Sequence, residues 1–107
     1  MRRRQEFQQV YNRGIRAQGR FMTVFLLPRK PGPPRLGIAA TKKLGGAVER
    51  NRAKRVVREI FRQHSNPSDL DIVVIPRRSL LTAAYDSIRA DYVSCVDRPV
   101  RRHEPAR

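Results

Sequence analysis

The sequence predicts an α+β fold in a single domain, with the element order helix, three strands, helix, strand, helix. Its 107 residues are enough for one modest hydrophobic core. Residues 53–61 repeat apolar side chains at helical spacing, whereas residues 21–27 and 71–75 are short apolar runs rich in β-branched or aromatic side chains. The chain shows no internal repeat and no second domain, so these patterns predict one mixed unit.

The N-terminal segment predicts a helix followed by a short strand. We expect the helix over residues 1–13, where Phe7 and Tyr11 share one face and Gly14 ends the helix. These two aromatic rings either pack in the core or form a platform for unpaired bases, and the sequence leaves both roles open. Residues 15–18 predict an edge strand.

Three further strands follow. Residues 21–27 are apolar on both faces, which predicts a central strand, and the proline-rich residues 28–34 form a loop. We expect residues 36–41 to pair with that strand as an antiparallel hairpin. Residues 71–75 predict a buried strand closed by Pro76, and the helix before it predicts a βαβ crossover with a parallel pair.

The helix of this crossover carries apolar and basic side chains on opposite faces. Gly45 and Gly46 let the chain turn into the helix, which ends near His64. Residues 42–62 hold eight Lys or Arg against Glu49 and Glu59, and Arg55 is the expected partner of Glu59. This excess of like charge favours an anionic partner. The apolar stripe consists of Ala53, Val56, Val57, Ile60 and Phe61, and the opposite pole carries Asn51, Arg55, Arg58 and Arg62.

The chain ends in a last helix and a basic tail. Thr82 is the expected cap of this helix. Residues 97–107 have no periodicity and contain two prolines, which predicts a disordered tail and a domain that spans residues 1–96. The apolar stripe of the last helix consists of Leu81, Ala84, Tyr85, Ile88, Tyr92, Cys95 and Val96.

Composition narrows the class of partner. The net charge is +15, from 24 Lys and Arg against nine acids, which points to nucleic acid or an anionic membrane. No apolar run approaches the roughly 20 residues that span a bilayer, so we expect no membrane partner. Cys95 is the only cysteine, which fits a reducing cytoplasm and a small buried side chain.

The sequence offers no convincing catalytic centre. Asp69 and Asp71 could hold a divalent ion, but acids at a strand entrance are the simpler explanation, and a two-metal nuclease needs more converging carboxylates. His64 and His103 do not form a ligand pair with zinc spacing. The residues alone therefore predict a basic RNA-binding domain without metal ligands or catalytic residues of its own.

The central motif of the chain resembles the signature of a known protein family. Within residues 45–59, the pattern Arg50-Asn51-Arg52-x-Lys54-Arg55-x-x-Arg58 resembles the signature of the bacterial ribonuclease P protein subunit. The resemblance extends to Phe7-x-x-Val10-Tyr11, to Lys42-Lys43 and to residues 72–77, and it covers about residues 4–96. Gly46, where the family often has Asn, and Pro76, where it has a small residue, depart from the pattern.

This resemblance implies both a fold and a function. The fold is an α-β-β-β-α-β-α sandwich with a small mixed sheet and a left-handed βαβ crossover. The function is that of the protein subunit of ribonuclease P, which removes the 5′ leader of precursor tRNA. The catalyst is the RNA subunit, which also holds most of the required Mg²⁺, and the protein is a cytoplasmic, monomeric cofactor that binds ribonuclease P RNA and precursor tRNA.

The resemblance also assigns two sets of binding residues. The leader-binding set borders a surface along which single-stranded RNA runs, and it consists of Phe7, Tyr11, Thr41 and Arg77. The set that faces the catalytic RNA consists of Lys42, Lys43, Arg50, Asn51, Arg52, Lys54, Arg55, Arg58 and Arg62.

Three other functions compete with this one. A ribosomal protein or general RNA chaperone would explain the charge but not the motif. A protein-only nuclease would depend on Asp69 and Asp71. A DNA-binding module would need a helix-turn-helix spacing that the sequence lacks.

Overall fold

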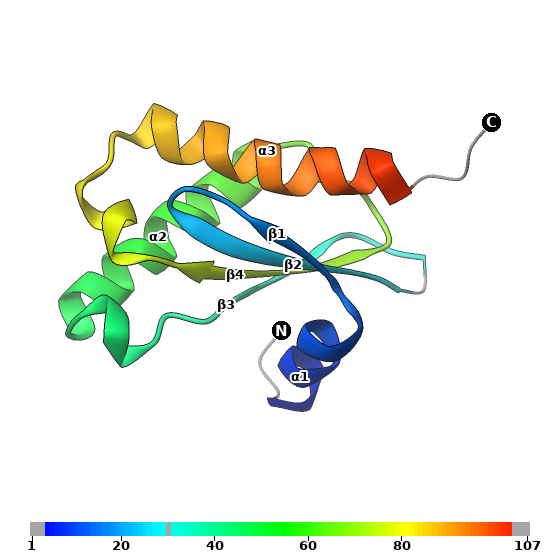
Figure 1. Ribbon diagram of the computed structural model, residues 1–107, viewed down its shortest axis with the longest axis horizontal. Helices are drawn as coiled ribbons and strands as arrows, with labels where there is room; N and C mark the ends of the chain where they lie inside the picture. The colour runs from blue at the N-terminus through cyan, green and yellow to red at the C-terminus, as the bar shows by residue number, and fades with distance from the viewer. Residues whose placement is uncertain (1–3, 30, 104–107) are drawn as a thin grey trace.

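A four-stranded mixed sheet forms the centre of the molecule, with helices on both of its faces (Figure 1). The computed structural model describes residues 4–29 and 31–103. The predicted order of helices and strands is confirmed, with two short 3₁₀ helices added. The strands are β1 (Ile15–Gln18), β2 (Met22–Pro28), β3 (Arg35–Ile38) and β4 (Leu70–Pro76). The helices are α1 (Arg4–Arg13), η1 (Lys42–Leu44), α2 (Ala47–Gln63), η2 (Arg78–Thr82) and α3 (Tyr85–His103).

The third strand pairs differently from our prediction. The strand order is β1-β2-β4-β3, so β4 lies between β2 and β3 and the predicted antiparallel hairpin is wrong. The reason lies in the loop after β2, where Arg29 N donates to Asp69 O and Gly32 N donates to Asp69 Oδ1, at 2.9 and 2.7 Å. The loop therefore packs on the entrance of β4 instead of turning tightly back.

The predicted parallel pair across α2 is confirmed, because β3 and β4 run parallel in the register Leu36 to Ile72 and Ile38 to Val74. The left-handed sense of this crossover rests on the family resemblance alone.

The main core lies between one face of the sheet and the helices α2 and α3. Alternate residues of β2 and β4 point into it, including Val24 and Ile72, which are fully buried. From α2, Val57 and Ile60 meet them, whereas the predicted stripe residue Val56 is only half-buried at the rim. The contribution of α3 to this core consists of Ile88, Tyr92, Cys95 and Val96.

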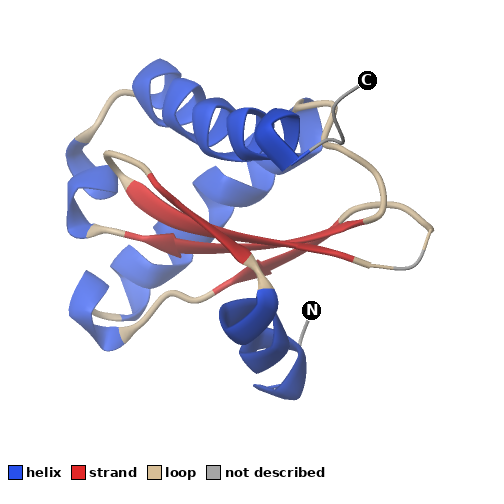
Figure 2. Cartoon of the chain, turned by 45° about the vertical axis from the view of Figure 1, so that its right-hand side comes forward, coloured by secondary structure: helices blue, strands red, loops and turns tan. Residues whose placement is uncertain are grey.

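Helix α1 covers part of the opposite face of the sheet (Figure 2). Val10 is fully buried there, and Gly14 follows the helix as predicted. A Cβ on Gly14 would collide with the Val10 carbonyl oxygen and lie 3.0 Å from that of Leu26, so only glycine permits this close approach. The predicted helical residues 1–3 lie outside the described chain.

A cluster of charged side chains fastens α1 to the sheet. The Arg35 guanidinium donates two hydrogen bonds to the Asp71 carboxylate and one to Glu6 Oε2, each of 2.8 Å. Arg29 Nε lies 2.8 Å from Asp71 Oδ1. The hydrogen bonds to Asp71 raise the pKa of Arg35 above its ordinary value. Asp71 thus joins the loop after β2, the start of β3 and, through Arg35, helix α1.

The last helix begins later and ends later than predicted. Thr82 belongs to η2, where its hydroxyl donates to Ser79 O, so its predicted role as helix cap is wrong. The helix continues to His103, so the predicted disordered tail is wrong for residues 97–103, and residues 104–107 lie outside the described chain. Asp97 Oδ1 lies 3.0 Å from His64 Nε2, which holds the helix at this point and lets it propagate.

No helix in the described part of the chain is long and apolar enough to cross a membrane.

We expect Asp71→Asn to lower the free energy of unfolding by about 2–3 kcal/mol, because it removes the charge that satisfies two arginines at a buried position. Urea denaturation followed by circular dichroism would measure this loss. Asp86→Asn, at an exposed position in the first turn of α3, is the matched control and should cost under about 1 kcal/mol. Equal losses of unfolding free energy in the two variants would show that Asp71 has no special role in stability.

Candidate nucleic-acid interface

A row of basic side chains lies on the side of α2 that faces away from the core. Because Ala53, Val57 and Ile60 are fully buried, the opposite side of the helix must face solvent. All four residues there are exposed. We call them the basic row: Asn51, Arg55, Arg58 and Arg62.

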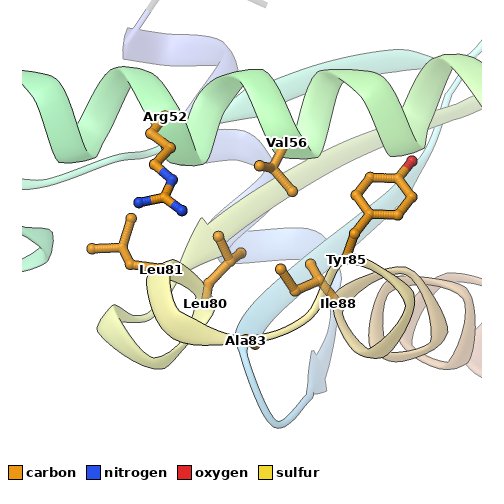
Figure 3. A pocket seen from close by; sticks show the side chains of 7 residues that line it. All are labelled: Arg52, Val56, Leu80, Leu81, Ala83, Tyr85 and Ile88. Atoms are coloured by element: carbon orange, nitrogen blue, oxygen red, sulfur yellow. The ribbon is translucent and has the colours of Figure 1, made fainter.

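The remaining residues of the motif flank the basic row on both sides. Arg52 points toward η2 and the start of α3, where it lines a hollow together with Val56 and Leu81 (Figure 3). At about 100° per residue, Arg50 and Lys54 lie on the other flank, and both are half-buried. The motif therefore covers more than one side of α2, and Arg52 has apolar neighbours that the basic row lacks.

Acidic side chains neutralise little of this charge. Glu59 pairs with Arg62 at 3.8 Å, and the predicted pairing of Glu59 with Arg55 is wrong. The Arg62 side chain is 76% exposed and that of Glu59 is 47% exposed, so the pair contributes little energy. Among the described residues of α2, this is the only ion pair, which leaves the basic row available to an external anion.

Lys42 and Lys43 extend the positive surface to the start of α2. Both are exposed on η1, which Leu44 anchors in the core. Gly45 has a φ of 142°, a conformation that other residues rarely adopt, and so it fixes the direction of the turn into α2. Gly46 caps the helix without a side-chain hydrogen bond, because glycine has no side-chain acceptor.

On the other face of the sheet, aromatic side chains connect α1 to β2. The rings of Phe7 and Tyr11 have centroids 6.3 Å apart, and Tyr11 meets Phe25 edge-on at 5.1 Å. All three rings are half-buried and lie outside the main core. Burial raises the pKa of the Tyr11 hydroxyl above its ordinary value. The name open sheet face is used below for the side of the sheet that carries Phe7, Tyr11, Thr23, Phe25 and Arg77.

Thr23 and Arg77 continue the open sheet face toward the carboxyl end of β4. Thr23 and Phe25 point to the same side of β2, and Arg77 Nη2 donates to Thr23 Oγ1 at 3.3 Å. Arg77 N also donates to Phe21 O at 2.9 Å, so the strand pairing continues past Pro76 despite that residue's departure from the family pattern. Phe7, Tyr11 and Arg77 therefore lie over the same face of the sheet, with Thr23 buried beneath Arg77.

Thr41 follows β3 and Arg77 follows β4. Because these two strands run parallel, both residues lie at the carboxyl ends of the strands, on the same side of the molecule. Thr41 is exposed at the start of η1.

The sequence alone missed the contribution of β1 and β2 to this surface. Register places Arg16 opposite Phe25 and Gln18 opposite Thr23, so both exposed polar side chains border the aromatic rings. Strand β2 is apolar at nearly every position, so its sequence does not show which of its two faces packs on the main core.

Asp69 and Asp71 have structural partners instead of a shared metal site. Asp71 binds Arg29 and Arg35, and Asp69 braces the loop at Gly32. Among the residues described, no three His, Cys, Asp or Glu side chains are grouped so that they could hold a metal ion.

Comparisons with known proteins agree with this arrangement. The family model described as Ribonuclease P matches residues 1–100. The ribonuclease P protein component of Oleidesulfovibrio alaskensis is 44% identical over 82 residues, which cover 73% of this chain and 66% of that protein. The component from Desulfovibrio desulfuricans is 43% identical over 93 residues, covering 83% of this chain and 72% of that protein.

Solved structures show the same fold. The RNase P protein from Thermotoga maritima superposes with a TM-score of 0.84 at 33% identity, covering 92% of this chain and 94% of that one. The family model matches nearly the whole chain, and two relatives are more than 40% identical to it. The chain belongs to the family of bacterial ribonuclease P protein components.

Proposed function

We propose that this chain, as the protein subunit of ribonuclease P, binds the catalytic RNA through α2 and η1 and binds the 5′ leader of precursor tRNA through the open sheet face. The observation that carries this proposal is the separation of two surfaces. The basic row belongs to a helix that packs on one face of the sheet, whereas Phe7 and Tyr11 lie on the other face.

The chemistry of each surface suits a different form of RNA. Guanidinium groups bind phosphates and are well matched to a folded RNA whose backbone presents many of them. Aromatic rings stack on unpaired bases of any sequence, which is what recognition of many different leaders requires. Arg16, Gln18 and Arg77 border the rings and can contact the backbone of such a strand.

In this proposal, the RNA subunit of ribonuclease P carries out the cleavage step. When bound by RNA phosphates, Mg²⁺ supplies the charge neutralisation that hydrolysis of a phosphodiester needs. The role of this chain is to hold the catalytic RNA and the leader in one complex, which strengthens binding of the substrate and favours binding of Mg²⁺.

The first test is cleavage of a precursor tRNA at low Mg²⁺ by the protein alone, by a bacterial ribonuclease P RNA alone, and by both together. We expect cleavage at the mature 5′ end only with both components, because the protein lowers the Mg²⁺ requirement of the RNA. Cleavage by the protein alone would instead indicate a nuclease, and no effect on a competent RNA would indicate a general RNA-binding protein.

The second test concerns the basic row. Arg58→Ala should weaken binding to ribonuclease P RNA about fivefold and reduce the slope of log affinity against log salt by about 0.7–0.9, the value of one phosphate contact. Titrations at several salt concentrations would measure both. Arg89→Ala is the matched control, an exposed arginine of α3 outside both surfaces. An unchanged slope in Arg58→Ala would argue against a phosphate contact.

The third test concerns the leader. Phe7→Ala should weaken binding of precursor tRNA to the reconstituted complex about tenfold and leave mature tRNA unaffected, since stacking on a base is worth about 1–3 kcal/mol. Phe7→Leu keeps an apolar side chain against Tyr11 and separates stacking from packing. If both tRNAs lose affinity equally, Phe7 does not contact the leader.

A further inference from the structure

A hollow of about 210 Å³ lies between α2 and the segment that joins η2 to α3 (Figure 3). Val56 points into it from α2, and Leu80 with Ile88 forms its floor. Leu81 and Ala83 complete its lower wall. Val56 and Leu81 belong to the predicted core stripes of two different segments, yet both remain half-buried, so the apolar walls of the hollow are partly exposed.

Two flat side chains stand at opposite ends of the hollow. Arg52 points into it from α2 at one end, and Tyr85 borders the other (Figure 3). The Tyr85 hydroxyl donates to Gln63 Oε1 at 3.1 Å, and Gln63 Nε2 in turn donates to Glu59 Oε1 at 2.9 Å. These bonds hold the exposed Tyr85 ring in place at the mouth.

The hollow combines apolar walls, an aromatic ring and a guanidinium group. Sites for drug-sized ligands enclose roughly 300–1,000 Å³, so this smaller volume suits a single flat group. Aromatic and guanidinium planes both stack on nucleobases, and a guanidinium also binds the phosphate attached to one.

From these features we propose that the hollow receives one unstacked nucleobase of the catalytic RNA, held between Arg52 and Tyr85. The proposal rests on the function proposed above, because it needs α2 to face that RNA.

Charge favours RNA over a protein as the occupant. Arg52 lines the hollow, and the exposed Arg55 is three residues further along the same helix, so a nucleotide in the hollow has cationic groups near its phosphate. Glu59 lies on the same side of α2 but pairs with Arg62. Val48 lies one helical turn before Arg52 and is 78% exposed, which extends the apolar strip along the same side of α2. The apolar side chains would contact the base of a nucleotide, and the cationic side chains beside them would contact its phosphate.

The test fills the hollow without changing charge. Ala83 has an extended backbone that accepts leucine, and Ala83→Leu should lower affinity for ribonuclease P RNA about tenfold while the salt slope stays that of the wild type. Val56→Phe fills the hollow from the opposite wall and should act in the same way. Ala90→Leu, at an exposed position of α3, is the matched control and should bind normally. Thermal melting verifies that each variant is folded.

A second measurement identifies the ligand group. Methyl NMR signals of Leu81 and Ile88 should shift when adenosine 5′-monophosphate is added to the wild-type protein and should not shift with ribose 5-phosphate, which lacks the base. In Ala83→Leu, the response to adenosine 5′-monophosphate should be lost.

Several results would overturn the proposal. They are normal RNA affinity in folded Ala83→Leu and Val56→Phe, equal responses to the two phosphates, or self-association of the wild type that Ala83→Leu abolishes. Failure of the wild-type protein to bind ribonuclease P RNA at all would be a different outcome, because it would refute the function proposed above and the base site with it.

Discussion

The Asp71 carboxylate is the interaction on which the arrangement of this molecule depends. It is almost fully buried, and it forms ion pairs with Arg29 and Arg35, which come from the two ends of the same loop. Through Arg35 it also reaches Glu6 on α1. A buried carboxylate tolerates few alternative partners, since leaving it unpaired is costly. One charge at the start of β4 therefore determines where the loop, the third strand and the first helix lie.

This arrangement separates the basic row from the open sheet face. Helices α2 and α3 enclose the main core on one face of the sheet, which leaves the outer side of α2 exposed. Helix α1 covers only part of the other face, so its aromatic rings remain half-buried beside β2. The strands β2 and β4 between them each pair with a neighbour on both sides. One small domain therefore presents a basic surface and an aromatic surface on different sides of its sheet.

Much of this was predictable from the sequence, for identifiable physical reasons. The long stripe of α2 and the turn at Gly45 and Gly46 are local signals, and both the helix and its exposed basic row were predicted correctly. The position of β3 was not, because strand pairing depends on Asp71 and Asp69, whose partners are distant in the sequence. Likewise, the uniformly apolar β2 gave no sign that Phe25 and Thr23 lie on the face opposite the main core, and the motif gave no sign that Arg52 borders a hollow.

The position of β4 in the middle of the sheet has a consequence for how the chain is built during translation. Arg35 bonds to Glu6, 29 residues before it, and to Asp71, 36 residues after it. The ribosome therefore makes α1 first but completes its docking site only when β4 emerges. A ten-residue helix is marginal on its own in water, so α1 waits as an unsupported segment during most of synthesis. The basic helix α2 leaves the ribosome earlier than β4. The positively charged surface of α2 is thus synthesised before the docking site of α1 is complete.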